Sequence, residues 1–259
     1  MTRTFILTLA ILSITACVPA PKVDIGVDSG QIQFNGQRAF ELESEFATTF
    51  KNRDSGTAAN KAAAEWIKAK FESVGWTCHL DEWEVVLYSE DVPLRNVVCE
   101  LRGQSPRQIL AVAHHDQAPE TIEGADNDAS GISILLHMAE IFASEEAPPY
   151  SLVFVATDAE EWGMLGTLRY VQTHPDTTNI IAGMSLDNLG HPYYAGMNME
   201  LTGQGKGYGP IWLALTTRAS AQAVGSEWDV YLPAAIDQII IKTTNKDVVG
   251  NRTCDVKLG

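Results

Sequence analysis

Apolar residues recur with two different periods along the first half of the chain. Between residues 58 and 74 they return at every third or fourth position, with charged residues between them, and Gly75 follows directly. That spacing places the apolar side chains on one face of a helix, which the glycine ends. Residues 76–86 and 96–101 instead alternate apolar and polar positions, so we predict two strands there.

Three nearly continuous apolar runs come next, at residues 109–113, 152–156 and 180–186. Strands of this kind are buried on both faces, as in the parallel part of an α/β sheet. Helical spacing over residues 130–143 separates the first run from the second, and a similar pattern over residues 163–172 separates the second from the third. This order predicts an α/β fold whose parallel strands are joined by crossover helices.

The N-terminus has the pattern of a secretion signal. Arg3 precedes an apolar run at residues 5–16, which is shorter than the ~20 residues that cross a bilayer. The run ends in Ile-Thr-Ala before Cys17, which resembles the lipobox of bacterial lipoproteins. We therefore expect residues 1–16 to be removed and Cys17 to carry a lipid. The alternative is a plain signal peptide with an incidental cysteine.

This reading sets the expected organisation and location of the protein. Residues 17–37 would be a tether, and residues 38–259 a single domain. Val18, which follows the cysteine, permits outer-membrane sorting by resemblance to Gram-negative lipoproteins. We expect an exported monomer anchored by lipid to the cell envelope, at the outer membrane or the periplasmic face. The formal net charge of -15 argues against nucleic acid and anionic membrane surfaces as partners, so the lipid would be the only membrane contact.

Export permits disulfides, and three cysteines besides the lipidated one are available. Cys78 and Cys99 fall in the two alternating segments, which could pair as neighbouring antiparallel strands, and Cys254 lies near the C-terminus. A bridge between Cys78 and Cys99 and a pair of buried thiols are equally compatible with the sequence, because pairing cannot be deduced from spacing. None of the cysteines has the spacing of a zinc cluster.

Imidazole and carboxylate groups follow the ends of the three apolar runs. His114 and Asp116 follow the first run, Glu160 and Glu161 the second, and Asp187 the third. The carboxyl ends of parallel strands line the crevice of an open α/β sheet, so these segments converge there. Such a gathering of acids repels itself unless a cation neutralises it. Carboxylate and imidazole without thiolate suit zinc, manganese or cobalt, of which zinc is the usual occupant.

Four motifs carry a family resemblance. They read Ala-His-His-Asp at 113–116, Gly-Ala-Asp-Asn-Asp-Ala-Ser-Gly at 124–131, Ala-Glu-Glu-Trp-Gly-Met-Leu-Gly at 159–166 and Leu-Asp-Asn at 186–188. In this order they resemble the co-catalytic dizinc aminopeptidases, the family of bacterial leucyl aminopeptidase, over residues 38–243. The resemblance implies a zinc exopeptidase-like, three-layer sandwich with a central mixed, largely parallel sheet flanked by helices. It also implies a hydrolase that removes N-terminal residues from peptide substrates.

The same resemblance implies a role for each motif residue. His114 and Asp187 would bind one zinc ion, and Glu161 would bind the other. Asp116 would orient the imidazole ring of His114. Glu160 would be the general base that takes a proton from the attacking water and passes it to the leaving amine.

Two features depart from the family pattern. Asn127 stands where the family has an acid that bridges both metals, and a neutral amide offers an oxygen but no charge. The family also ends with a histidine ligand on a late loop, whereas His191, the only histidine after Asp187, comes too early for that role. We expect residues 234–243 to form a helix and the last strand and helix to be missing, as in a truncated or frameshifted reading frame.

Two functions of different class follow from these observations. The first is a zinc aminopeptidase of the cell envelope, with its activity impaired by Asn127 and by the missing histidine. Its metal complement would fall from two ions to one or none, with His114, Asp187 and Asn127 as the mononuclear remnant. The second is a non-catalytic, envelope-anchored relative that binds peptides or partners, or a non-functional fragment. Metal content and chelator-sensitive hydrolysis discriminate between them.

Overall fold

The computed structural model describes residues 34–87, 89–144, 146–189, 196–199, 228–231 and 239–243. The expected signal peptide at residues 1–16 and the lipidated Cys17 lie outside these residues, as do His191, Cys254 and the chain after residue 243. Within the described parts of the chain, no helix combines the length and apolar character needed to cross a bilayer.

The central sheet is mixed, as predicted. Its strands are β1 (Thr77–Leu87), β2 (Glu90–Leu101), β3 (Ser105–His114), β4 (Tyr150–Thr157) and β5 (Ile180–Ser185), in the spatial order β1-β2-β4-β3-β5. The three apolar runs are confirmed as the adjacent strands β4, β3 and β5, which are parallel to one another. The two alternating segments form the antiparallel hairpin β1–β2, which joins the sheet through an antiparallel pairing of β2 with β4.

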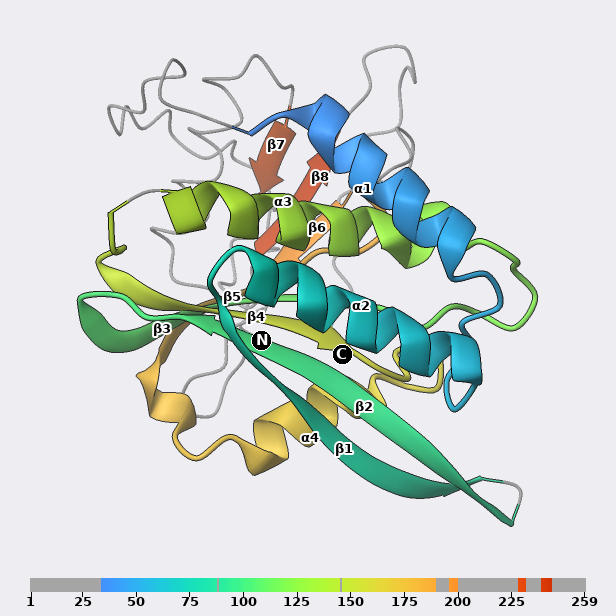
Figure 1. Ribbon diagram of the computed structural model, residues 1–259. Coiled ribbons are helices and arrows are strands. Elements are labelled where there is room, and N and C mark those ends of the chain that lie inside the picture. The colour runs from blue at the N-terminus through green and yellow to red at the C-terminus, as the bar shows by residue number, and fades with distance from the viewer. Residues whose placement is uncertain are drawn as a thin grey trace, which may run out of the picture.

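Helices cover both faces of this sheet, which makes three layers (Figure 1). On one face lie α1 (Gly36–Thr49), α2 (Ala58–Ser73) and α3 (Ser130–Ser144), and on the other lies α4 (Leu165–Thr173). The last three were predicted from apolar spacing. The first was not predicted, and it begins within the last residues of the expected tether. Asn35 caps α1 by accepting from the backbone N–H of Gln37 at 3.0 Å, as an N-cap asparagine does.

The main core lies between the sheet and the three helices of its first face. Phe71 of α2, Trp76 and Phe154 of the central strand β4 pack together, with ring centroids of Trp76 and Phe154 4.6 Å apart. The indole N–H of Trp76 donates to the backbone oxygen of Ala139 in α3 at 3.2 Å. Burial of each such side chain contributes about 1.5–3 kcal/mol, so these contacts hold α2 and α3 against the strands.

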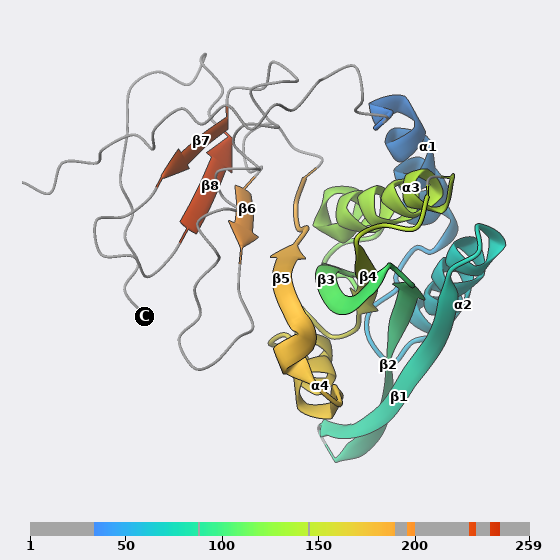
Figure 2. The same ribbon diagram turned by 90° about the vertical axis from the view of Figure 1, so that its left-hand side faces the viewer.

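A second, smaller sheet corrects one prediction. Strands β6 (Gly196–Met199), β8 (Ile239–Thr243) and β7 (Trp228–Tyr231) pair antiparallel in that order, and β6 lies beside β5 (Figure 2). The predicted helix at residues 234–243 is therefore wrong over its second half. Three consecutive isoleucines begin β8, and their β-branched side chains favour a strand over a helix.

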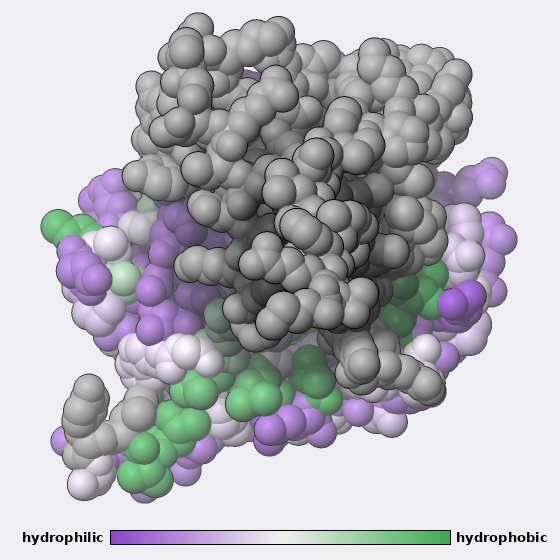
Figure 3. Space-filling model, turned by 180° about the vertical axis from the view of Figure 1, so that it is seen from behind, coloured by the Kyte–Doolittle hydropathy of each residue, from purple (hydrophilic) through white to green (hydrophobic). Residues whose placement is uncertain are grey.

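Figure 3 shows where hydrophobic side chains are exposed on the face opposite to that of Figure 1. Much of the coloured surface there is hydrophilic, and hydrophobic patches run from near the tip of the β1–β2 hairpin, at the lower left, along the lower edge of the view. Val86, near that tip, is 71% exposed. In the five-stranded sheet, apolar side chains of β2, β3, β4 and β5 are buried in two clusters, one on each face of the sheet.

The structure decides the open question about the cysteines. Cys78 of β1 and Cys99 of β2 stand directly opposite each other in the hairpin and form a disulfide. Cys99 is fully buried against the core, and Cys78 is partly buried beside it. The bridge therefore ties the edge strand of the sheet to its neighbour.

We expect the double variant Cys78→Ala with Cys99→Ala to lose about 3 kcal/mol of unfolding free energy, because the bridge closes a loop with a sequence separation of 21 residues. Urea unfolding followed by circular dichroism measures this loss. Adding a reducing agent should lower the midpoint of the original chain and leave that of the variant unchanged. Equal midpoints for the two chains under oxidising conditions would contradict the prediction.

Candidate metal centre

The predicted residues meet at one edge of the sheet, where the parallel strands end. His114 is the last residue of β3, Glu160 and Glu161 follow β4, and Asp187 follows β5. Asn127 lies in the irregular helical turn Ala125–Ala129 before α3, where its backbone leaves the helical conformation. Chain segments separated by up to 73 residues in the sequence therefore bring their side chains to one place, as the apolar runs predicted.

The imidazole of His114 is held from one side by Asp116. The Nδ1 of His114 lies 3.2 Å from Oδ1 of Asp116, and both side chains are buried. The same carboxylate accepts from the backbone N–H groups of Glu160 and Glu161, each at 3.2 Å. Because Nδ1 has a carboxylate partner, Nε2 of the ring is the atom that faces the other site residues.

On its other side, His114 faces Asn127 and Asp187. Its Nε2 lies 2.8 Å from Oδ1 of Asn127 and 3.7 Å from Oδ1 of Asp187. The amide nitrogen of Asn127 donates to Oε1 of Glu161 at 2.5 Å. The Asn127 amide therefore lies between two groups: the His114 imidazole with Asp187 on one side, and the Glu161 carboxylate on the other.

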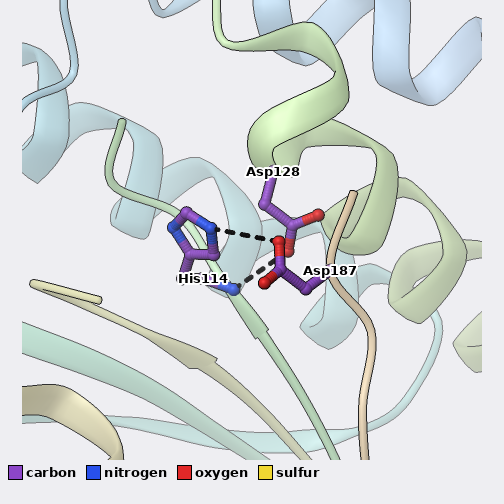
Figure 4. A group of neighbouring side chains, drawn as sticks. All are labelled: His114, Asp128 and Asp187. Atoms are coloured by element: carbon purple, nitrogen blue, oxygen red, sulfur yellow. Dashed lines mark hydrogen bonds and ion pairs between the residues drawn. The ribbon is translucent and has the colours of Figure 1, made fainter. Parts of the chain in front are cut away.

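Asp128 is a buried neighbour of the site that the sequence analysis did not select. Figure 4 shows its side chain converging with those of His114 and Asp187. Its carboxylate accepts from the backbone N–H of His114 at 3.2 Å and from that of Gly131 at 2.9 Å. A Cβ at Gly131 would come within 2.4 Å of this carboxylate, so the glycine leaves room for Asp128. The signal was an aspartate three residues before the glycine at the start of a predicted helix.

Asn188, also not predicted, holds the Asp187 carboxylate. Its side-chain nitrogen donates to Oδ1 of Asp187 at 2.6 Å and lies 3.4 Å from Oδ1 of Asn127. Asp187 is partly exposed, with 42% of its side chain accessible, whereas Asp116 and Asp128 are fully buried. Two adjacent loops are thus joined through amide groups at the mouth of the site.

The pKa values of the site residues are shifted by burial and by the negative charges around them. Burial lowers the pKa of His114, but its hydrogen bonds to Asp116 and Asp187 overcome this and raise the pKa well above 6.5. Burial raises the pKa of Asp128 to about 8, against the influence of His114, and Asp187 raises it further. Burial, together with the charges of Asp187 and Glu161, also raises the pKa of Glu160. A cation at this place would offset the repulsion among the acids.

The donor atoms fit a metal ion. Ligand atoms of His114, Asp128 and Asp187 all lie within 4.8 Å of one another, and so do those of His114, Glu160 and Glu161. Two ligands at about 2.0–2.2 Å from a tetrahedral zinc ion are about 3.3–3.6 Å apart. The Nε2 of His114 and Oδ1 of Asp187 are 3.7 Å apart. Imidazole and carboxylate donors without thiolate match zinc. The carboxylate of Asp128 already accepts hydrogen bonds from two backbone N–H groups. We therefore propose His114, Asp187, Glu161 and Asn127 as the metal ligands.

The family model for peptidase family M28 matches residues 96–230, which carry all of these residues. The chain belongs to peptidase family M28. It is 29% identical over 167 residues to the alkaline phosphatase isozyme conversion protein of Escherichia coli, covering 55% of this chain and 48% of that protein. It is 28% identical over 200 residues to a probable zinc metalloprotease of Pyrenophora tritici-repentis, covering 65% of this chain and 44% of that protein. The chain thus spans about half the length of these curated relatives.

Solved structures of bacterial enzymes are also similar to this chain in fold. A Zn-dependent exopeptidase from Parabacteroides distasonis superposes with a TM-score of 0.55 and 23% identity, covering 62% of this chain and 64% of that one. A glutaminyl cyclase from Porphyromonas gingivalis superposes with a TM-score of 0.57 and 24% identity, covering 62% and 61%. These likenesses confirm the predicted zinc exopeptidase-like fold, and at this level of identity they say nothing about the substrate of this M28 chain.

We expect Asp116→Asn to weaken zinc binding by this M28 chain about 10- to 100-fold, the usual cost of removing the partner that orients a ligating histidine. An asparagine has a single acceptor oxygen, so it cannot serve the imidazole and both backbone N–H groups. Competition with a chromophoric chelator measures the affinity. Glu120→Gln removes an exposed acid from the nearby loop and is the matched control. Unchanged zinc affinity in Asp116→Asn would refute the orienting role.

Proposed function

We propose that this chain is a zinc-dependent aminopeptidase that removes N-terminal residues from peptides in the cell envelope. The observation that carries the proposal is the direction of the His114 ring: Asp116 holds its Nδ1, and its Nε2 faces Asp187 and the pair formed by Asn127 and Glu161. Residues 38–259 would be the peptidase domain, exported behind the signal at residues 1–16 and anchored through a lipid on Cys17.

The proposed ligands of a single zinc ion are His114 and Asp187 together with the side-chain oxygen of Asn127, and Glu161 would bind a second ion where one is present. Zinc bound there supplies a Lewis acid that polarises the scissile carbonyl and activates the attacking water. The buried Asp116 would keep Nε2 of His114 available as a ligand. The relative named a zinc metalloprotease supports the choice of zinc over the other metals that suit these donors.

Glu160 is the proposed general base. Its backbone N–H is fixed on Asp116 at 3.2 Å, which fixes the loop that presents its side chain. The carboxylate is half-buried, and its pKa is raised by burial and by the charges of Asp187 and Glu161. A base whose pKa is raised toward the working pH accepts a proton from water and later delivers it to the leaving amine.

The acids also support the preference for a free N-terminus. The α-amino group of a peptide is cationic at neutral pH, and Glu160, Glu161 and Asp187 form a negative rim around the place where the scissile bond would lie. An α-ammonium group is attracted to such a rim, whereas the backbone next to an internal peptide bond carries no positive charge. This argument favours exopeptidase over endopeptidase chemistry for the M28 domain.

Asn127 supports a single bound ion. Its amide accepts at one end and donates to Glu161 at the other, so Glu161 is satisfied by a neutral group. A carboxylate at this position would repel Glu161 and require a second cation, and an amide does not. The same contact is the observation that favours the alternative function, a non-catalytic peptide-binding relative, because it stabilises the site without any metal.

We expect Glu160→Gln to lower the rate of hydrolysis of aminoacyl-p-nitroanilides about 10²- to 10⁴-fold while the chain still binds zinc, because the amide cannot take the proton of the attacking water. Dialysis against a chelator should abolish hydrolysis by the original chain, and zinc should restore it. N-acetylated substrates are the control for the free amine. A chain with no chelator-sensitive hydrolysis of either substrate would not be an aminopeptidase.

We expect Asn127→Asp to raise the zinc content from about one ion per chain to about two, because a carboxylate supplies the charge that a second dication needs. Elemental analysis after dialysis measures the content. Asn52→Asp makes the same charge change at an exposed position and should leave the content at one. Two ions already bound by the original chain would overturn the single-ion argument.

A further inference from the structure

Arg53 is a fully buried cation beneath the candidate site, and the proposed chemistry gives it no role. It lies in the short turn between α1 and α2. Its guanidinium stands over the ring of Phe46, 4.8 Å from the centroid. Burial lowers its pKa to about 10, so it stays charged at neutral pH. No hydrogen bond between Arg53 and a carboxylate is present among the described residues, so its N–H groups donate to neutral oxygens instead.

All the hydrogen bonds of this guanidinium go to two segments of the site and to its own turn. Nε donates to the backbone oxygen of His115 at 2.9 Å, and Nη1 donates to the side-chain oxygen of Gln117 at 3.2 Å. On the other side, Nη1 donates to the backbone oxygen of Glu123, and Nη2 donates to that of Gly124 at 2.7 Å. The first pair belongs to the segment that carries His114 and Asp116. The second pair opens the turn that carries Asn127.

The Gly124 oxygen extends this link across the turn. It also accepts from the backbone N–H of Ala129 at 3.1 Å, so it is held both by Arg53 and by the residue that closes the turn around Asn127. The backbone of Gly124 has a φ of +49°. A Cβ there would lie 2.9 Å from Nη2 of Arg53 and 2.7 Å from the backbone oxygen of Asn127. The approach of the guanidinium is thus close enough to require a residue without a side chain.

The neighbours of Arg53 reinforce the same contact. The backbone N–H of Asn52 donates to the Ile122 oxygen at 2.9 Å. Lys51 forms an exposed ion pair with Glu123 at 2.6 Å, which adds little by itself. Residues 51–53 therefore dock along residues 122–124, and Arg53 is the member of this contact that also reaches the His115 segment.

We infer that Arg53 is a positioning residue of the M28 site, which fixes the turn carrying Asn127 relative to the strand end carrying His114. A planar guanidinium donates in several fixed directions at once, so it can join carbonyl groups of two segments, which a single ammonium cannot do with the same geometry. The charges of Asp116 and Asp128 offset its own. The consequence for metal binding rests on the proposed function, whereas the consequence for the turn does not.

The first readout needs no metal. Hydrogen–deuterium exchange of the full, zinc-free chain is followed by mass spectrometry on peptides that span residues 118–129. We expect Arg53→Gln to speed exchange there at least about 10-fold, because the Gly124 oxygen loses the donor that holds it. Arg95→Gln is the matched control: Arg95 is also a buried guanidinium, but it donates to Asn60 and not to the turn. Unchanged exchange in Arg53→Gln, or equal acceleration in both variants, would overturn the inference.

The second readout is zinc affinity, by chelator competition on the same chains. We expect about 10- to 100-fold weaker binding in Arg53→Gln and less than about a twofold change in Arg95→Gln. If Arg53→Gln does not fold, Arg53→Lys keeps the charge and should still show the faster exchange and weaker binding. Full rescue by lysine would show that charge alone suffices and would overturn the bridging role. If the original chain binds no zinc, the proposed function fails, and the exchange experiment still decides the role of Arg53.

Discussion

The candidate site depends on one carboxylate, that of Asp116. A single buried group binds the ring of His114 and the backbone N–H groups of Glu160 and Glu161, so it joins the end of β3 to the loop after β4. A buried carboxylate with several donors is held firmly, because each lost hydrogen bond leaves an unsatisfied charge in a region of low dielectric. The direction of the imidazole and the position of the two glutamates are therefore set together.

Around that framework, negative charge accumulates to a degree that the protein alone does not balance. His114 and the deeper Arg53 are positively charged groups beside the site, while Asp128, Glu160, Glu161 and Asp187 all face or border the same space. Asn127 relieves part of the repulsion by placing an amide between His114 and Glu161. With an aspartate in place of Asn127, the site would have one more negative charge to neutralise. The amide removes that charge, and we therefore expect a single ion in this member of family M28.

The layers on either side of the sheet explain why the loops stay in register. The aromatic core between β4 and the helices α2 and α3 fixes the strands, and α3 begins directly at the turn that carries Asn127. The turn between α1 and α2 then reaches the site from outside the sheet through Arg53. Helix α3 and the turn between α1 and α2 thus both position the site. The helix does so through packing against the sheet, and the turn does so through hydrogen bonds from Arg53 to backbone oxygens.

The sequence by itself determined the strands and helices with strong periods, the parallel buried strands, and the convergence of His114, Glu160, Glu161 and Asp187, because burial imposes apolar runs and parallel strands end at one edge. That the sheet is mixed followed from the family resemblance. The sequence did not reveal α1, most of which lies within the expected domain but for which no helix was predicted, and it misread residues 239–243, where strand pairing overrode the expected helix. Only the tertiary structure decided the disulfide, the two contacts of the Asn127 amide, and the roles of Asp128 and Arg53. Those depend on distances between segments far apart in the chain, which local periodicity does not encode.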